Sequence, residues 1–399
     1  MKQPLRVLYV SHSFPPEEGI LKNVGGMQRV AMELHAALKR QEEVHVVDRI
    51  LRTTDRWIEI LAAPFLIGSL WKIPYLARKH SVDVVLYTSM VTAALAPFLK
   101  RRLQAMGIRQ VAIVHGRDVT LPASLYQWYV PKFLPWIFQA LDAVLPVSRA
   151  TAKESILRGL PPERCFVVPN GIAVERFPEP PPYTERRMRL QQAFPEYARQ
   201  LTPDTFILCS VGRHVERKGF HWFIQEVMPH LPEHVQYWLV GEGPLTPRIQ
   251  DTIQQLGLQQ RVHLLGKIPD EALTRLYQGA DLFIMPNIPV PGDMEGFGVV
   301  MLEASLNELP VIASALEGIQ DVVAEGENGH LVAPRVPEGF IQWISYYAQH
   351  PNDLRKLSQK ARAYVRRQFA WEVVAQQYVE RLRQIAGQDT SVPASVETG

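Results

Sequence analysis

The stretch "TFILCSVGRHVERKGF", from Thr205 to Phe220, decides the fold of this protein. It begins with a short uncharged apolar run, turns at a glycine among several cations, and leads into the helical pattern "WFIQEVMPHL" at 222–231. A continuous apolar run of this length is typical of a strand that is buried on both faces of a parallel sheet. The stretch therefore predicts one strand–turn–helix unit of an α/β fold.

The same pattern recurs on both sides of this stretch. In the second half the apolar runs are "VQYWLVGEG" (235–243), "RVHLLGKI" (261–268), "DLFIMPN" (281–287) and "LPVIASA" (309–315). In the first half they are "LRVLYV" (5–10), "EVHVVD" (43–48), "VDVVLYTS" (82–89), "RQVAIVHG" (109–116), "DAVLPVS" (142–148) and "RCFVVPNG" (164–171). The segments between them are long enough for crossover helices, which predicts an α/β protein with two Rossmann-like domains. Because such sheets bind ligands at the carboxyl ends of their strands, the two sheets should face a central cleft.

Length and proline content predict where the domains meet. A chain of 399 residues exceeds what one hydrophobic core usually supports. Four prolines between Pro178 and Pro182 disfavour a helix and favour an extended linker. The predicted parts are a first domain at 1–175, a linker at 176–183, a second domain at 184–370, a helix at about 371–387 that crosses back onto the first domain, and a disordered tail at 388–399.

Charge and cysteine usage exclude several classes of protein. The chain has 43 basic and 40 acidic side chains, a net charge of +3, which is too small to indicate a nucleic-acid partner. Cys165 and Cys209 stand far apart without metal-ligand spacing, so neither a disulfide framework nor a zinc site is expected. The first apolar run is too short for a signal peptide. These features predict a cytoplasmic protein.

One apolar stretch, "WIEILAAPFLIGSLWKIPYL" (57–76), has the length of a membrane span. Glu59, Lys72 and two prolines interrupt it, so we do not expect it to cross a bilayer. Together with the aromatic run at 125–138 and the cations at 99–104, it could dock on an anionic membrane. The alternative is that these aromatic and apolar residues belong to the core of the first domain.

Two carboxylates stand eight positions apart in "GDMEGFGVVMLEAS" (292–305). The glycines around Phe297 permit close backbone approach, which is typical of a turn that binds an anion or a sugar. Glu303 lies in an apolar helical run and is expected to be at least partly buried, where a ribose diol could satisfy it. The alternatives are an ordinary ion pair for Glu303 and a solvated loop carboxylate for Glu295.

Two cations stand at the end of the apolar run 205–213 and shortly after it. Arg213 and Lys218 lie between the strand end and a helix start, a placement that suits a diphosphate leaving group. The alternative is a solvated basic loop, and we assign Glu216 and Arg217 to that solvated class.

Two features of the first domain complete the candidate site. His115 and Gly116 come directly after a strand. A lone histidine is more often a structural residue, but a position at a strand end raises the odds of a functional role. The paired glycines Gly25 and Gly26 open the first helix and could admit a phosphate. In neither domain does the turn between the first strand and the first helix carry the GxGxxG pattern, which argues against a dinucleotide-dependent dehydrogenase.

Taken together, these pieces resemble the glycosyltransferases of family four, which are retaining enzymes of the GT-B fold. The matching pieces are "GG" at 25–26, "HG" at 115–116, "PNGI" at 169–172, "GRHVERKGF" at 212–220, "GEGP" at 241–244 and the E-x7-E pair formed by Glu295 and Glu303. They cover about residues 5–335. The form of the E-x7-E segment is similar to that of the phosphatidylinositol mannosyltransferase subgroup.

The resemblance implies that the domain at 1–175 binds the acceptor and that the domain at 184–370 binds the nucleotide-sugar donor. It also implies a role for each matching residue. Arg213 and Lys218 would hold the nucleotide diphosphate, Glu295 would bind donor-sugar hydroxyls with the amides around Phe297, and His115 would lie beside the reactive face of the sugar. Glu303 would bind the ribose, and the backbone near Ile268 would meet the base. The implied catalytic residues are His115, Arg213, Lys218 and Glu295, and the implied donor-binding residues are Gly25, Gly26, Ile268, Gly296, Phe297, Gly298, Val299 and Glu303.

The resemblance also implies a reaction. A hexose would pass from a nucleotide-sugar co-substrate, with GDP-mannose favoured, to a hydroxyl of a glycan, inositol or lipid-linked acceptor, and the leaving phosphate would help to deprotonate that acceptor. No cofactor and no metal are expected, because Arg213 and Lys218 can neutralise the diphosphate. UDP-glucose and UDP-N-acetylglucosamine are alternative donors. A nucleotide-sugar epimerase and a non-catalytic nucleotide-sugar binding protein are alternatives of another class.

Overall fold

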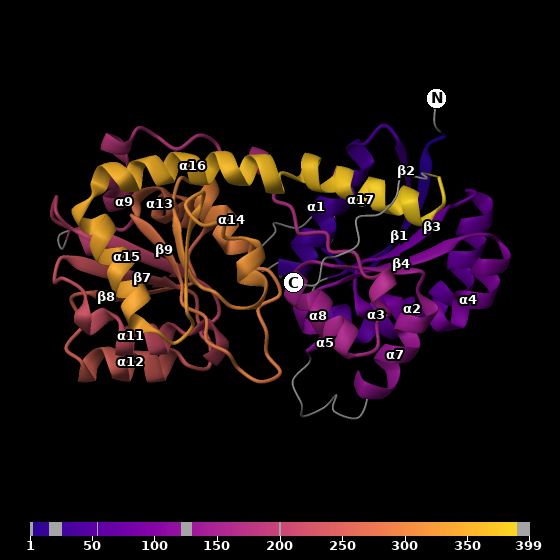
Figure 1. Ribbon diagram of the computed structural model, residues 1–399, viewed down its shortest axis with the longest axis horizontal. Coiled ribbons are helices and arrows are strands. Elements are labelled where there is room, and N and C mark those ends of the chain that lie inside the picture. The colour runs from indigo at the N-terminus through magenta and orange to yellow at the C-terminus, as the bar shows by residue number, and fades with distance from the viewer. Residues whose placement is uncertain (1–2, 16–25, 54, 121–129, 199–200, 389–399) are drawn as a thin grey trace. The chain divides into compact units, whose positions relative to one another are not determined.

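The computed structural model describes residues 3–15, 26–53, 55–120, 130–198 and 201–388. The chain divides into two compact units (Figure 1). The first unit comprises Met1–Ala173 together with Phe369–Gly399, and the second comprises Val174–Gln368. Gly25, residues 125–129 of the aromatic run and residues 389–399, for which predictions were made above, lie outside the described residues.

Within its described residues, the first unit contains a five-stranded sheet in the order β2-β1-β3-β4-β5. Its strands are β1 (Leu5–Phe14), β2 (Val44–Arg52), β3 (Val84–Tyr87), β4 (Arg109–Val114) and β5 (Ala143–Pro146), and every pair is parallel. The chain order reverses between β1 and β3, so this sheet has its ligand-binding switch point there.

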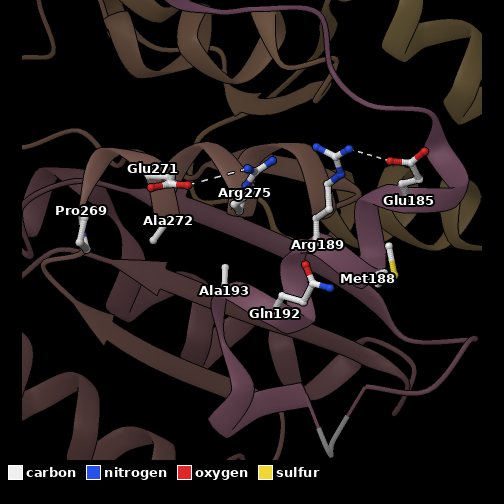
Figure 2. A pocket seen from close by; sticks show the side chains of 9 residues that line it. All are labelled: Glu185, Met188, Arg189, Gln192, Ala193, Pro269, Glu271, Ala272 and Arg275. Carbon is white, nitrogen blue, oxygen red and sulfur yellow. Dashed lines mark hydrogen bonds and ion pairs between the residues drawn. The ribbon is translucent and has the colours of Figure 1, made fainter.

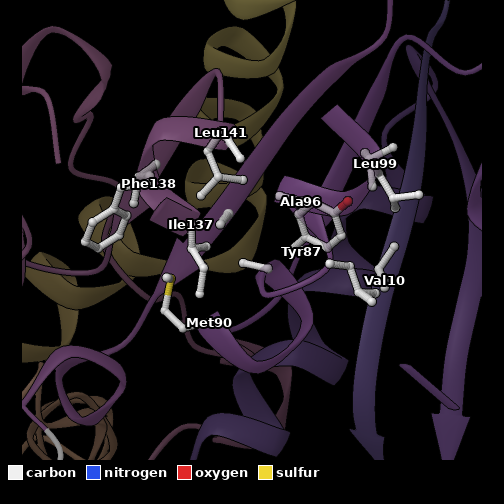
Figure 3. Close-up of a cluster of buried hydrophobic side chains, with 14 of the residues drawn as sticks. Val10, Tyr87, Met90, Ala96, Leu99, Ile137, Phe138 and Leu141 are labelled. Atoms are coloured by element: carbon white, nitrogen blue, oxygen red, sulfur yellow. The ribbon is translucent and has the colours of Figure 1, made fainter. Parts of the chain in front are cut away.

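The helices of the first unit cover this sheet. They are α1 (Gly26–Arg40), α2 (Asp55–Lys79), α3 (Met90–Ala93), α4 (Ala96–Ala105), α5 (Gly116–Val119), α7 (Val130–Ala140), α8 (Arg149–Leu157), the short 3-10 helix η1 (Pro162–Arg164) and α17 (Trp371–Ile385). Figure 3 shows the core that they bury, in which Val10 and Tyr87 of the sheet lie with Leu99 of α4 and Phe138 of α7. Fully burying a side chain such as Leu or Phe stabilises the fold by roughly 1.5–3 kcal/mol.

Helix α17 packs against α1 within the first unit. The indole nitrogen Nε1 of Trp371 donates a hydrogen bond to Oε2 of Glu33 at 2.7 Å. The ring lies over Gly171, where an added Cβ would come within 2.5 Å of it. The glycine of "PNGI" is thus required by the packing of this tryptophan.

Within its described residues, the second unit contains a six-stranded sheet in the order β11-β10-β9-β6-β7-β8. Its strands are β6 (Phe206–Val211), β7 (Val235–Val240), β8 (Val262–Gly266), β9 (Leu282–Met285), β10 (Val311–Ser314) and β11 (Gly329–Val332), again all parallel. Here the order reverses between β6 and β9. The predicted α/β class with two Rossmann-like sheets is therefore confirmed.

The second unit also contains helices on both sides of its sheet. They are α9 (Tyr183–Ala193), α10 (Pro195–Ala198), α11 (Phe220–Glu226), α12 (Thr246–Gln255), α13 (Asp270–Gly279), α14 (Val299–Leu306), α15 (Pro337–Gln349) and α16 (Pro351–Phe369). Short 3-10 helices are η2 (Val174–Arg176), η3 (Glu216–Lys218), η4 (Met228–His230) and η5 (Glu317–Asp321). The proline-rich residues 177–182, all of them described, form neither helix nor strand.

Three details differ from the sequence-based expectations. The run at 164–171 lies beside β5, with an isolated bridge from Cys165 to Val144 and backbone hydrogen bonds from Phe166 to Val144 and from Val168 to Pro146, but it forms no strand, so the predicted sixth strand of the first sheet is wrong. Strand β11 was not predicted, because its four residues begin with Gly329 and His330 and carry no long apolar signal. The stretch at 57–76 is not interrupted by its prolines, since α2 continues through both Pro64 and Pro74.

Candidate functional site

The loops that follow β6 and β9 meet at the switch point of the second sheet. Nζ of Lys218 lies 2.6 Å from Oε2 of Glu295, and Nη1 of Arg217 lies 2.5 Å from the same oxygen. The three side chains are largely buried, with exposed fractions of 9%, 16% and 12% for Lys218, Arg217 and Glu295. The two loops are thus joined by a buried cluster of two cations and one carboxylate.

Gly219 allows these two loops to approach each other. The 3-10 helix η3 ends at Gly219, which has a left-handed backbone with φ of +66°. A Cβ at this position would lie 1.8 Å from the carbonyl oxygen of Pro286, directly after β9. Only glycine fits so close to a neighbouring backbone, and the glycine of "ERKGF" therefore places Lys218 beside Glu295.

Further contacts fix the carboxylate of Glu295. Nδ2 of Asn287 donates to Oε2 of Glu295 at 3.2 Å, and Nε of Arg217 donates to Oδ1 of Asp293 at 3.1 Å. Burial opposes ionisation of Glu295, but the cations of Lys218 and Arg217 outweigh it and lower its pKa to about 2. Burial lowers the pKa of Lys218, an effect that Glu295 opposes. Glu295 is therefore an anion over the whole physiological range.

The backbone of Glu295 is held by the segment that follows β10. Oε2 of Glu317 accepts a hydrogen bond from the Glu295 N–H at 2.5 Å, and the N–H of Gly318 donates to the Glu295 carbonyl at 3.1 Å. Glu317 has a left-handed backbone with φ of +49°, a conformation that residues other than glycine rarely adopt. Burial raises the pKa of Glu317 to about 7, although its bond to the Glu295 amide opposes the shift.

The turn after Glu295 leads into α14 as the sequence predicts. Gly298 adopts φ of +89° and directly precedes Val299, the first residue of the helix. Phe297 is buried, and the carbonyl of Gly296 lies 2.1 Å from where a Cβ on Gly318 would stand. The turn is therefore packed against the Glu317 segment, and the first amides of α14, which have no partner within the helix, follow Glu295 closely along the chain.

Glu303 is buried in α14, with 9% of its surface exposed, which confirms the expectation for this carboxylate. The hydroxyl of Tyr277 on α13 lies 3.3 Å from its Oε2 and donates to it. A ribose-binding role for Glu303 stays a prediction.

Arg213 and Ile268 lie at the same edge of the second sheet. Arg213 follows β6, and its side chain is exposed. Ile268 is half-buried in the loop between β8 and α13. Both belong to the carboxyl ends of strands, together with Lys218 and Glu295.

The remaining predicted residues lie in the first unit. Gly26 is the first residue of α1, while Gly25 is not described. His115 follows β4 and is buried, and its Nε2 lies 3.2 Å from the carbonyl oxygen of Thr88. Because a carbonyl can only accept, Nε2 carries the proton of this ring. Burial lowers the pKa of His115, which favours the neutral imidazole at physiological pH.

At the carboxyl edge of each sheet lie further residues that the sequence analysis did not predict as site residues. In the first unit, Asp118 accepts hydrogen bonds from the N–H groups of Met90 and His115, and His12 Nδ1 lies 3.5 Å from Ser89 Oγ. In the second unit the missed residues are Arg217, Asn287, Asp293 and Glu317. The prediction that Arg217 is solvated is wrong, because it pairs with Glu295 and Asp293. Of these four, only Asn287 had a sequence signal, since it ends the predicted strand run "DLFIMPN" (281–287).

A separate hollow of about 570 Å³ lies between α9 and α13 (Figure 2). Its charged side chains pair with one another, Arg189 with Glu185 at 2.7 Å and Arg275 with Glu271 at 3.8 Å. Its lining includes none of the predicted site residues. Within the described residues, no three His, Cys, Asp or Glu side chains lie together in a group that could hold a metal ion.

Comparisons with known proteins match both units of the chain. The family model described as "Glycosyltransferase Family 4" matches residues 24–176, and the model "Glycosyl transferases group 1" matches residues 205–350. The chain is 28% identical over 316 residues to the amylovoran biosynthesis glycosyltransferase AmsK of Erwinia amylovora, covering 77% of this chain and 72% of that protein. It is 28% identical over 344 residues to the GDP-mannose-dependent alpha-(1-6)-phosphatidylinositol monomannoside mannosyltransferase of Mycolicibacterium smegmatis, covering 82% and 85%.

The fold has a close counterpart among solved structures. The crystal structure of Anabaena HepE in complex with UDP matches with a TM-score of 0.71 at 18% identity, covering 95% of this chain and all of that one. The two matched family models follow each other along the chain, one in each unit of the structure. The chain therefore belongs to the family-four, group 1 glycosyltransferases, and it is a glycosyltransferase of the GT-B fold.

Proposed function

We propose that this glycosyltransferase moves a hexose from a nucleotide-sugar donor, GDP-mannose in the first place, to a hydroxyl of a lipid-linked or glycan acceptor, with retention of the anomeric configuration. The observation that carries the proposal is the buried cluster of Lys218, Arg217 and Glu295 at the switch point between β6 and β9. Open α/β sheets bind their ligands at this point.

The cations of the cluster suit the diphosphate of a nucleotide sugar. An ammonium group carries three N–H donors, so Lys218 can hold Glu295 and a phosphate oxygen at once. Arg213, exposed at the same edge, and the first amides of α14 supply further donors. As the glycosidic bond breaks, negative charge develops on the leaving diphosphate, and fixed cations in a buried site stabilise it. On this basis we propose that the transfer requires neither a metal nor another cofactor.

The carboxylate of Glu295 suits the hydroxyls of the donor sugar. The contacts from Lys218, Arg217 and Asn287 all converge on Oε2. We assign Oε1 to the sugar hydroxyls, with the amides of Gly296, Phe297 and Gly298 beside it. A carboxylate whose pKa is about 2 remains a hydrogen-bond acceptor throughout catalysis.

The other predicted residues take the remaining parts of the donor and the reaction. Glu303 would bind the ribose, Ile268 would meet the base through its backbone, and Gly25 and Gly26 would lie near the phosphates. His115, neutral and fixed by its bond to Thr88, would present its ring to the sugar. The acceptor oxygen would bond to the sugar on the face from which the diphosphate leaves, and the leaving phosphate would take the acceptor proton. Neither a protein nucleophile nor a separate base is therefore assigned.

The relatives support the choice of donor and acceptor. The mycobacterial relative is named as GDP-mannose-dependent and as acting on a phosphatidylinositol mannoside. We extend both properties to this chain and place its work in the cytoplasm, at the inner face of the membrane. UDP-glucose and UDP-N-acetylglucosamine remain the second candidates for the donor.

The test is a transfer assay with phosphatidylinositol mannosides and the three nucleotide sugars, followed by proton NMR of the product. The proposal predicts acceptor-dependent release of GDP and an α-linked mannoside from the α-linked donor. A β-linked product would contradict retention. Release of UDP without release of GDP would identify UDP-glucose or UDP-N-acetylglucosamine as the donor in place of GDP-mannose. If the sugar of the donor is epimerised when no acceptor is present, the protein is an epimerase and the transferase proposal is wrong.

A further inference from the structure

Helix α2 is apolar on two opposite faces. Its inner face buries Phe65, Ile73 and Ala77, and the helix contacts β1, β2 and α4. Its outer face exposes large apolar side chains, among them Ile67 and Trp71, with exposed fractions of 59% and 65%. A helix on the surface of a domain is normally polar on its outer side. The outer face of α2 therefore has the composition of a surface that contacts something apolar.

The apolar surface continues onto the neighbouring helices. Helix α4 packs between α2 and α7, as their contacts show. Phe98 of α4 is 65% exposed, and its ring meets that of Trp136 of α7 edge to face, with 5.2 Å between the ring centres. We call this the α2–α4–α7 surface, and its main exposed apolar residues are Trp57, Ile60, Ile67, Trp71, Phe98 and Trp136.

The same three helices are strongly basic. They contain eight Lys and Arg residues against two acidic ones, while the whole chain has a net charge of only +3. Among the side chains of these helices that the structure describes, the exposed cations are Lys72, Arg78, Lys79, Lys100, Arg101 and Arg102. Nζ of Lys72 lies 5.1 Å from the ring centre of Tyr75, so a cation and an aromatic ring share the outer face of α2. Exposed aromatic rings among cations are typical of a protein surface that lies at an anionic lipid interface.

We propose that the α2–α4–α7 surface docks the first unit on an anionic lipid bilayer. The tryptophans and isoleucines would enter the headgroup boundary, and the cations would contact lipid phosphates. The proposal rests on the proposed function, because docking would bring the unit that we assign to acceptor binding to a lipid-linked acceptor.

A bilayer surface is a better occupant than a membrane span. Within the described residues, Ile60–Lys79 is the one helical segment long and apolar enough to cross a membrane, by its length and composition alone. Crossing would pull Phe65, Ile73 and Ala77 away from the sheet, since these side chains are buried in the first unit. Lying on the surface keeps that core intact and uses only the side chains that are already exposed.

The experiment is flotation of the full chain with two kinds of vesicle, phosphatidylcholine alone and phosphatidylcholine mixed with phosphatidylglycerol, at low and high salt. The proposal predicts that the protein floats with the anionic vesicles at low salt and is released at high salt. Ile67→Glu combined with Trp71→Glu should lower the bound fraction about tenfold. The matched control is Leu157→Glu on α8, since Leu157 is 69% exposed in the same unit but lies outside the surface.

Several results would overturn the proposal. The first is a wild-type chain that stays at the bottom of the gradient with anionic vesicles at low salt, and the second is a double variant that floats like the wild type. The third is protein that resists alkaline extraction from the vesicles, as a membrane-spanning protein does. The fourth is a dimer that forms through this surface in the absence of lipid. If the double variant does not fold, a blue shift of wild-type tryptophan fluorescence on adding anionic vesicles supports docking, and its absence contradicts it. Donor binding by the second unit separates the two proposals, because a chain that floats but binds no nucleotide sugar contradicts only the proposed function.

Discussion

Lys218 and Glu295 form a buried ion pair, with 2.6 Å between Nζ and Oε2, although the first follows β6 and the second follows β9. A buried pair is costly to form and is weak evidence for stability alone, because both ions lose their hydration. Here the pair lies at the switch point of the sheet and shares its carboxylate with Arg217. Its position makes it the natural centre of a donor site.

Lys218→Ala should lower kcat/KM by a factor of about one hundred or more, because one fixed donor to a developing charge contributes roughly that much. The fold should persist, since Arg217 and Asn287 still hold Glu295. Steady-state kinetics and thermal unfolding measure both. Lys356→Ala, whose side chain is 74% exposed, is the matched control and should behave as the wild type. A fully active Lys218→Ala variant would remove this residue from the site.

Glu295→Gln should change how stability depends on pH. The pKa of Glu295 is lowered to about 2 in the folded protein from 4.5, so its ionised form stabilises the fold above about pH 4.5. That contribution is lost as the pH falls toward 2 and is of the order of 3 kcal/mol. Denaturant unfolding of both proteins between neutral and acid pH measures it. A difference between wild type and variant that does not shrink on acidification contradicts the ion pair.

Glu317 is predicted to be a positioning residue, because its side chain holds the Glu295 amide while its backbone has φ of +49°. Glu317→Gly relieves a left-handed backbone that costs roughly 1 kcal/mol, so stability should not fall, yet the donor KM should rise about tenfold as Glu295 loses its anchor. Glu317→Gln keeps an accepting oxygen and should restore the donor KM. Kinetics and unfolding of the two variants decide the matter, and an unchanged KM in the glycine variant argues for a structural role only.

The raised pKa of Glu317, about 7, gives a further prediction with the opposite sign from that of Glu295. The folded protein holds this proton more tightly than the unfolded chain, so stability should decline as pH rises from about 4.5 to about 7. Glu317→Gln cannot ionise and should lack this decline. If the free energy of unfolding of the wild type and of Glu317→Gln depends on pH in the same way, the pKa of Glu317 is not raised by folding and the prediction is wrong.

Gly171→Ala should destabilise the first unit by roughly 1–3 kcal/mol, because the new methyl group would overlap the ring of Trp371. Gly68→Ala in α2 is the control, since its Cβ would meet only Arg49 at 3.7 Å. Alanine is favoured over glycine inside a helix, so the control should be neutral or slightly stabilising. Denaturant unfolding compares the two. Equal stabilities would mean that Trp371 does not pack on Gly171.

The strands and the carboxylate pair were predictable because their signals are local. Runs such as "FILCSV" are apolar throughout, as strands buried on both faces must be. Glu303 was predictable because it is a lone charge in an apolar helix. Arg217 was not, because its partners Asp293 and Glu295 are brought to it by the approach of two loops at Gly219. Glu317 gave no signal either, since its partner is a backbone amide after another strand.

The most direct measurement is isothermal titration of GDP-mannose, UDP-glucose and UDP-N-acetylglucosamine into the wild type, Lys218→Ala and Lys356→Ala. The account predicts that the wild type and Lys356→Ala bind one of these donors equally, with GDP-mannose the tightest, and that Lys218→Ala loses about tenfold or more in affinity. Equal binding by all three proteins, or no binding of any nucleotide sugar by the wild type, would contradict the claim that the Lys218–Glu295 cluster holds the donor.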